Sequence, residues 1–464
     1  MTTAYHGLGD GHSGFDAAAV PAPAVTGATS AGPGGAARPS RWLEGAVRAS
    51  HWIRRARVTT SHGHLWLAAP EPPGRLFATS DLYSGSAGVV LFLLELARAT
   101  GEASLREEAA GGALHLARTL APGPGAGLYD GLAGIGFVVL EAARALDSAE
   151  LRAGALRAVE LIEESARPAG EGVEWSGSTD IVSGGAGTAL FLVDAARELG
   201  RRSARDLALS GGERLAELGI PVAGGLAWRG APDDPLLMPN FSHGTAGVAY
   251  ALATLATESG RSDLAERAAA GAHHLLAVAD AEGDGCRVFH HEPGGRDLFY
   301  LSWCHGPAGT ARLFAQLARA TADRLWLAWV WRAARSIRSS GAPEQESPGY
   351  WRNFGRCCGA AGLGELFLGL YSAFGREEDL AFARRVGEHL LGSAVPIGDG
   401  LAWPHAEQRT RPEQVYPQTG LMQGAAGIGL FLLRLDAAER DRDWALRFPD
   451  EPEWRALGGL VGSA

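Results

Sequence analysis

The pattern of apolar and polar positions predicts two kinds of helix that alternate along the chain. The first kind is rich in Ala and Leu and apolar on nearly every face, so it is expected to be buried on nearly every face. Examples are 89–99, 135–145, 248–257 and 428–435. The second kind is more charged and has one apolar stripe, which predicts an outer layer. Examples are 105–120, 151–166, 263–276 and 380–391.

The ends of several helices are marked by residues that favour helix caps. Ser40 precedes Arg41 and Trp42, and the pattern predicts an amphipathic helix from there to about Arg57. Glycine stands a few residues before several outer helices, where it fits a left-handed C-cap in a tight helical hairpin. These glycines are Gly101, Gly200, Gly260 and Gly375.

A short glycine motif, G-x-x-G, stands at the start of every inner helix. It occurs seven times, and its first glycines are 46 to 65 residues apart. The first glycines are Gly85, Gly131, Gly184, Gly244, Gly306, Gly359 and Gly424. Self-similarity at this spacing indicates an internal repeat with loops of variable length.

The repeat predicts an all-α fold. With the helix that begins after Ser40, there are seven outer and seven inner helices, which indicates a closed ring of helical hairpins, an α/α toroid. We expect residues 40–464 to form this ring as a single domain. Residues 1–39 are rich in Ala, Gly and Pro, and we expect them to be a disordered tail.

The glycines suggest where the chemistry lies. A small residue at the start of each inner helix lets the inner helices converge without side-chain clashes and lets the backbone approach the contents of the central cavity. We therefore expect the residues just before each first glycine to line the mouth of the ring. They are Tyr83-Ser84, Tyr129-Asp130, 180–183, Ser242-His243, Cys304-His305, Cys357-Cys358 and Met422-Gln423.

Composition and charge narrow the classes of protein. With 46% hydrophobic and 20% charged residues, the chain is expected to be soluble and globular. A net charge of −10 gives no basic field for phosphates, so nucleic acid is not expected as a partner. No apolar run reaches the roughly 18 to 20 residues of a transmembrane segment, and no signal pattern opens the chain. We expect a cytoplasmic protein.

Three of the four cysteines stand inside the repeated motif. Cys304, Cys357 and Cys358 do so, whereas Cys286 does not and is predicted to be structural. Their spacing is unlike that of a secreted disulfide framework. Three thiolates suit Zn²⁺ and leave one coordination position open, which is typical of a catalytic zinc site. Because free cysteines are often buried, a place in the apolar core is the alternative for each.

The charge of such a centre favours thiol chemistry. Zn²⁺ with three thiolates carries −1, and a fourth thiolate from a substrate makes it −2. The metal keeps that sulfur deprotonated, and the excess negative charge keeps it nucleophilic. His243 is a candidate general acid or base, or a local hydrogen-bonding residue. Asp180 is a candidate partner of the site, or the N-cap of the third inner helix. His305 is a candidate second proton donor or fourth metal ligand.

These motifs resemble the lanthionine synthetase C-like (LanC-like) cyclase family over about residues 75–440. The carriers are the seven G-x-x-G copies, Ser242-His243-Gly244, the 302–306 stretch S-W-C-H-G and the 356–359 stretch R-C-C-G. The resemblance implies a seven-fold toroid with one catalytic zinc. It also implies that a substrate cysteine adds to the β-carbon of dehydroalanine or dehydrobutyrine, which closes the (methyl)lanthionine rings of lanthipeptides.

The resemblance extends to single residues. Cys304 and Cys357 match the two zinc cysteines of the family, and Cys358 stands where many members have histidine. His243 matches the proposed acid/base histidine, and Asp180 matches an aspartate that orients it or relays protons.

At two positions the chain departs from the family. Many members have an arginine where this chain has Tyr300, and the nearest arginine, Arg296, is four residues upstream. The residue after the first zinc cysteine is often tyrosine, here His305.

The expected partner is a dehydrated precursor peptide. The chain has no room for a fused dehydratase, kinase or lyase, so dehydration is expected from separate enzymes. One alternative is addition of glutathione or another small thiol to dehydrated proteins. Another is a non-catalytic, peptide-binding scaffold of a biosynthetic complex. A toroidal terpene cyclase or glycoside hydrolase is disfavoured, because its carboxylate pairs belong at the mouth of the ring, and Asp233-Asp234 lies in a Pro-flanked loop.

Overall fold

The computed structural model describes residues 39–461 except 71–76, 232 and 282. The chain divides into two compact units, 1–38 and 39–464, and the architecture below is that of the second unit. The predicted disordered tail lies outside the described residues, apart from Pro39.

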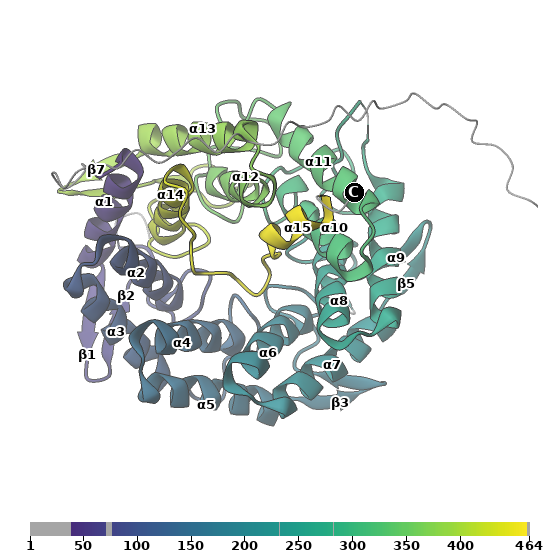
Figure 1. The fold of residues 1–464 in the computed structure, drawn as a ribbon, viewed down its shortest axis with the longest axis horizontal. Coiled ribbons are helices and arrows are strands. Elements are labelled where there is room, and N and C mark those ends of the chain that lie inside the picture. Colours follow the sequence, from purple (N-terminus) through teal and green to yellow (C-terminus); the bar gives the residue numbers. More distant parts are fainter. Residues whose placement is uncertain (1–38, 71–76, 232, 282, 462–464) are drawn as a thin grey trace, which may run out of the picture. The chain divides into compact units, whose positions relative to one another are not determined.

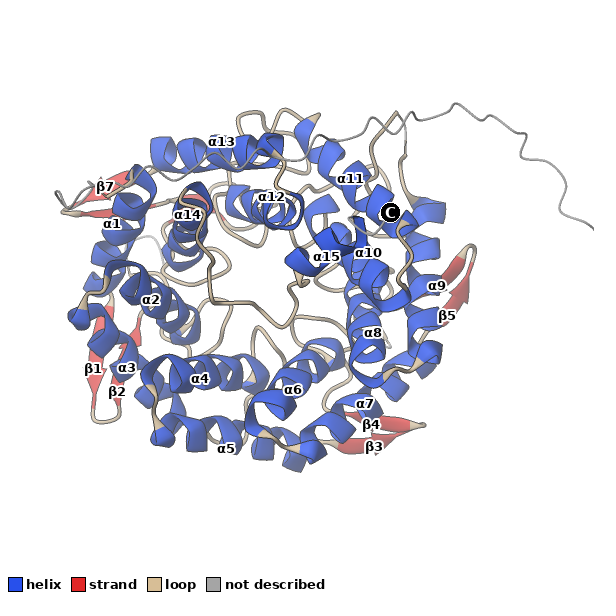
Figure 2. Ribbon diagram, in the orientation of Figure 1, coloured by secondary structure: helices blue, strands red, loops and turns tan. Residues whose placement is uncertain are grey.

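Two concentric layers of helices form this unit (Figures 1 and 2). The inner helices are α2 (Ser86–Thr100), α4 (Leu132–Leu146), α6 (Gly185–Leu199), α8 (Thr245–Ser259), α10 (Pro307–Thr321), α12 (Ala360–Phe374) and α14 (Ala425–Glu439). The outer helices are α1 (Arg41–Arg55), α3 (Ala103–Arg118), α5 (Ala149–Ser165), α7 (Arg202–Glu217), α9 (Ser262–Val278), α11 (Leu325–Arg338) and α13 (Glu377–Ser393). The predicted α/α toroid is confirmed.

A closed belt of backbone hydrogen bonds joins the loops that precede the seven inner helices. Each repeat donates to the next, and the seventh donates to the first. The bonds are Tyr83 N to Tyr129 O (2.8 Å), Tyr129 N to Val182 O (2.9 Å), Ile181 N to Ser242 O (3.2 Å), Ser242 N to Cys304 O (2.9 Å), Cys304 N to Cys357 O (3.2 Å), Cys357 N to Met422 O (2.8 Å) and Met422 N to Tyr83 O (2.9 Å). The belt fixes the residues before the glycines as neighbours around one circle.

The predicted helix ends are confirmed. Ser40 caps α1 and accepts a hydrogen bond from the Leu43 amide at 3.1 Å, although α1 ends at Arg55 rather than near Arg57. The four predicted C-cap glycines adopt the left-handed conformation, with φ between 64° and 75°. A left-handed residue ends each helix and lets the chain turn at once into the next outer helix.

The second glycine of the motif stands where a side chain would clash with nearby loops. A Cβ added at Gly309 would lie 2.1 Å from the carbonyl oxygen of Trp303 and 2.6 Å from Cβ of Phe241. At Gly187 the nearest atom is likewise a carbonyl oxygen, that of Ile181, at 2.1 Å. Glycine here therefore lets the preceding loop fold back onto the start of its own helix and also lets the loop of a neighbouring repeat approach closely.

The described residues also form five short antiparallel hairpins, which the sequence pattern did not predict. Their strands are β1 (Arg57–Thr60) with β2 (Gly63–Trp66), β3 (Arg167–Ala169) with β4 (Gly172–Glu174), β5 (Ile220–Val222) with β6 (Gly225–Ala227), β7 (Val395–Ile397) with β8 (Gly400–Ala402), and β9 (His405–Ala406) with β10 (Val415–Tyr416). The first four hairpins each follow an outer helix, and a tryptophan ends or follows the second strand of each.

A last helix, α15 (Trp454–Val461), lies outside the repeat and packs against α10 and α12. Figure 1 shows the chain crossing the middle of the inner layer between α14 and α15. Among the described helices, none combines the length and apolar character that a bilayer span requires.

Candidate metal centre

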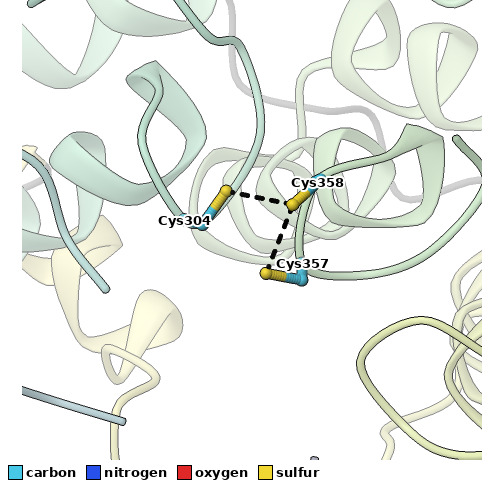
Figure 3. Close-up of side chains that lie close together, drawn as sticks. All are labelled: Cys304, Cys357 and Cys358. Carbon is cyan, nitrogen blue, oxygen red and sulfur yellow. Dashed lines mark hydrogen bonds between the residues drawn. The ribbon is translucent and has the colours of Figure 1, made fainter. Parts of the chain in front are cut away.

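Three cysteine sulfurs meet at the belt. Cys358 Sγ lies 3.4 Å from Cys304 Sγ and 3.5 Å from Cys357 Sγ, and all three sulfurs lie within 4.8 Å of one another (Figure 3). Among the described residues they form the one group of three or more His, Cys, Asp and Glu side chains able to share a metal ion. Cys286 lies outside this group, as the sequence suggested.

The belt explains how residues 54 positions apart come together. Cys304 and Cys357 each stand two residues before the first glycine of a motif, and the backbone amide of Cys304 donates to the carbonyl of Cys357. Cys358 follows Cys357 directly, so adjacent repeats deliver three sulfurs to one place.

The donor set fits Zn²⁺. Sulfurs bound to tetrahedral zinc at about 2.3 Å lie about 3.8 Å apart, close to the two shorter separations here. A disulfide would need about 2.05 Å, so all three thiols are free. Three sulfur donors form a soft site that suits zinc rather than magnesium or calcium, which prefer oxygen ligands.

Burial alone does not favour three thiolates. Burial raises the pKa of Cys304 well above its ordinary value, and the hydrogen bonds with the two other thiols raise it further. Hydrogen bonds from Cys304 and Cys357 instead lower the pKa of Cys358. Within the cluster, the pKa of Cys304 is therefore raised and that of Cys358 is lowered, so Cys358 is the thiol that loses its proton more readily.

The cluster lies in the wall of a cavity of about 260 Å³. The lining includes the three cysteines together with His243, Tyr300, His305, Trp351, Arg409 and Gln423. Polar groups thus gather around the three cysteines, in a cavity that a substrate could enter.

Asp180 and His243 form a pair at the cavity. Asp180 Oδ2 lies 2.6 Å from His243 Nδ1, while Oδ1 accepts hydrogen bonds from the amides of Ser183 and Gly184 at 2.7 and 3.0 Å. Asp180 is therefore not the N-cap of α6, which is Gly184; its carboxylate instead holds the turn before the helix and contacts the histidine. Burial lowers the pKa of His243, but the hydrogen bond and charge of Asp180 outweigh it, so the pKa is raised.

His305 is buried and stacked. Its ring lies 4.1 Å from that of His290 at an angle of 11°, and both of its ring nitrogens are buried without a hydrogen-bond partner. Its nitrogens do not belong to the metal-binding group, so a role as fourth ligand gains no support. Burial and the neighbouring His290 hold the pKa of His305 well below its ordinary value, which keeps the ring neutral.

Several cavity residues were not singled out by the sequence. Arg409 comes from the loop between β9 and β10, which the repeat does not include, so no pattern pointed to it. Gln423 stood in the repeat register without a role. Its amide lies 3.6 Å from Cys358 Sγ and 3.1 Å from the hydroxyl of Tyr83. Arg296, in contrast, is 63% exposed, pairs with Glu292 and does not line the cavity.

Comparison with known proteins agrees with the geometry. A family model described as lanthionine synthetase C-like protein matches residues 77–449. The structure of a nisin cyclase is similar, with 15% identity, 89% of this chain and 95% of that chain covered, and a TM-score of 0.59. A sugar epimerase from a ruminal bacterium has 14% identity, 87% and 98% coverage, and a TM-score of 0.50. At these identities the structural likeness establishes the fold alone. No curated protein sequence matches.

Proposed function

The chain belongs to the lanthionine synthetase C-like family, and from this premise we propose that it is a zinc-dependent lanthionine synthetase acting on a dehydrated precursor peptide. The reaction adds a cysteine thiol of the peptide to dehydroalanine or dehydrobutyrine. A carbon–sulfur bond forms at the β-carbon, the electrons of the double bond move toward the α-carbon and its carbonyl oxygen, and a proton then reaches the α-carbon.

One observation carries the proposal: three cysteines and His243, which is hydrogen-bonded to Asp180, line the same cavity. Cys304, Cys357 and Cys358 would hold the zinc and leave one tetrahedral position. When bound, zinc would lower the pKa of a substrate thiol and keep it deprotonated near neutral pH.

We assign proton delivery to His243. Asp180 occupies Nδ1, so Nε2 is the nitrogen left for the substrate, and the raised pKa keeps the imidazolium available as a general acid. Arg409 also lines the cavity, and its positive charge would stabilise the negative charge that develops on the carbonyl oxygen of the substrate. His305, neutral and unpartnered, offers hydrogen bonding to the bound peptide.

The substrate chemistry sets the context of the reaction. Because dehydrated residues are consumed, a separate dehydratase or a kinase and lyase must first remove water from serine and threonine. We place the reaction in the cytoplasm, where reducing conditions keep cysteine thiols free.

The test combines metal analysis with ring closure. Purified protein is expected to contain about one zinc per chain, and Cys304→Ala is expected to lose both the zinc and the thioether product, followed by mass spectrometry of a dehydrated precursor. Cys286→Ala is the matched control, because this buried cysteine lies outside the cluster. Ring closure at the wild-type rate in a zinc-free Cys304→Ala protein would falsify the proposal.

A second arm of the same assay identifies the thiol source. Glutathione is supplied to a dehydrated peptide that lacks cysteine, and the adduct is measured. Efficient glutathione addition with no ring closure on a cysteine-containing peptide would identify the small-thiol activity instead.

A further inference from the structure

The segment that follows α14, residues 440–461, folds back into the centre of the inner layer. Three apolar side chains of this segment are buried, those of Leu446, Phe448 and Trp454. The helix α15 then packs against α10 and α12. Figure 1 shows this segment in yellow, crossing the space that the inner helices surround. It has no counterpart in the other repeats, so its contacts are specific to this end of the chain.

Asp450 is the most completely enclosed polar group of this segment, with none of its surface exposed. Its Oδ1 accepts a hydrogen bond from the hydroxyl of Tyr129 at 3.1 Å, and its Oδ2 accepts one from Nε1 of Trp303 at 3.0 Å. Arg312 Nη1 donates to Oδ2 at 3.1 Å and to the backbone carbonyl of Asp450 at 2.9 Å. The charge of the carboxylate is thus balanced, and its hydrogen bonds are charge-assisted.

The partners of Asp450 connect it to the metal centre. Tyr129 belongs to the belt, and Trp303 directly precedes Cys304. On the other side, Arg356 directly precedes Cys357, pairs with Glu365 at 2.7 Å and lies over the ring of Phe448 at 3.8 Å. The residue before each of the first two cysteines is therefore held by a contact with residues 440–461.

We propose that Asp450 is a positioning residue of the metal centre: by binding the indole of Trp303 and the hydroxyl of Tyr129, it fixes the loop from which Cys304 reaches the metal. This inference rests on the proposed zinc site. Ligands of a tetrahedral site must be held within about 0.5 Å, and buried hydrogen bonds to the supporting residues provide that precision. Loss of such support typically weakens metal affinity roughly 10- to 100-fold.

The adjacent residue offers a matched control. Glu451 is also a buried carboxylate of the same segment, and it pairs with Arg434 at 3.0 Å. Within the described part of the chain, its carboxylate makes no hydrogen bond to a belt residue or to a residue next to a cysteine. Asp450→Asn and Glu451→Gln therefore both remove one buried charge from residues 440–461. They differ in whether the lost charge supports Trp303.

The experiment measures Zn²⁺ affinity by competition with a chelator, together with the thiolate charge-transfer spectrum of the Co²⁺-loaded protein. Asp450→Asn is expected to weaken Zn²⁺ binding at least tenfold and to alter the Co²⁺ spectrum. Glu451→Gln is expected to leave both within twofold of wild type, even where it lowers thermal stability. Equal losses in the two variants, or unchanged affinity in Asp450→Asn, would overturn the inference.

A second variant covers the case in which Asp450→Asn does not fold. Trp303→Phe removes the indole N–H but keeps the Asp450–Arg312 pair, and it should change metal affinity and the Co²⁺ spectrum in the same direction. Unchanged values for this variant would contradict the inference. Wild-type ring closure is measured in parallel. If the wild type binds zinc but forms no thioether, the proposed activity fails and the positioning role stands; if it binds no metal, both fail.

Discussion

Asp180 and His243 show how a single contact sets the protonation of a side chain at the cavity. The anion stabilises the imidazolium, so removing it should lower the pKa of His243 from its raised value. If the imidazolium is the general acid, activity is present below this pKa and is lost as pH rises through it. Asp180→Asn is therefore expected to move the alkaline limb of the profile of kcat/KM for ring closure to lower pH.

A matched control separates this effect from the loss of a cap. Asp81 accepts hydrogen bonds from the amides of Ser84 and Gly85 at 2.7 and 3.2 Å, as Asp180 does from the equivalent amides of its own repeat. Among the described residues, Asp81 makes no hydrogen bond to a histidine. Asp81→Asn should leave the alkaline limb in place. An identical shift in both variants would show that the loop, rather than the charge beside His243, controls the profile.

Arg409 is the residue whose role at the cavity is easiest to test by charge removal. Arg409→Gln should lower kcat for ring closure, by roughly 10- to 100-fold if the guanidinium stabilises the developing negative oxygen. Arg411→Gln is the control, because Arg411 is exposed on the same loop and does not line the cavity. An effect on KM alone would assign Arg409 to peptide binding instead.

Arg409 and the cysteines differ in whether the sequence alone could predict that they line the cavity. Cys304, Cys357, Cys358 and His243 were found because each stands one or two residues before a repeated glycine, and the belt brings these positions together in space. Arg409 lies in a long loop with no counterpart in the other repeats. Its position depends on tertiary folding that no local period encodes.

Among the secondary-structure elements, three of the four outer hairpins are tied to the end of an outer helix by a tryptophan. The indole Nε1 of Trp175, Trp228 and Trp403 donates to a carbonyl in the last turn of the preceding outer helix, at 3.1, 2.7 and 2.7 Å. Last-turn carbonyls have no backbone partner within their helix, so these bonds help to satisfy them. The hairpins escaped prediction because strands of two to four residues are too short for an alternating pattern.

The first hairpin provides an internal control for this hydrogen bond. Trp66 is as buried as Trp228, and its backbone amide likewise bonds a hydroxyl at the start of an inner helix, but its indole nitrogen has no partner. Trp228→Phe should therefore lower the free energy of unfolding by about 1 to 3 kcal/mol more than Trp66→Phe does. Denaturant unfolding of the two variants measures the difference. Equal losses would mean that ring volume, not the hydrogen bond, stabilises the hairpin.

Over the whole ring, closure of the belt brings together the residues of the proposed metal site. The repeat predicted the toroid because seven equal units of two helices each cannot bury their inner faces alone. It did not predict residues 440–461, which belong to no repeat and lie inside the ring. The metal ligands come from two neighbouring repeats, and the belt runs through both and returns to the first. A metal bound there is held only by the closed ring, since unfolding separates Cys304 from Cys357.

This arrangement predicts that zinc stabilises the folded ring. A ligand that binds only the native state adds about 2.7 kcal/mol at a free concentration 100-fold above its Kd. Adding Zn²⁺ to chelated protein is therefore expected to raise Tm by several degrees in wild type and in Cys286→Ala, but not in Cys304→Ala. Differential scanning calorimetry at two free Zn²⁺ concentrations gives the result. If Cys304→Ala shows the same shift, the stabilising ion is bound elsewhere, and the three sulfurs are a buried thiol cluster rather than a metal centre.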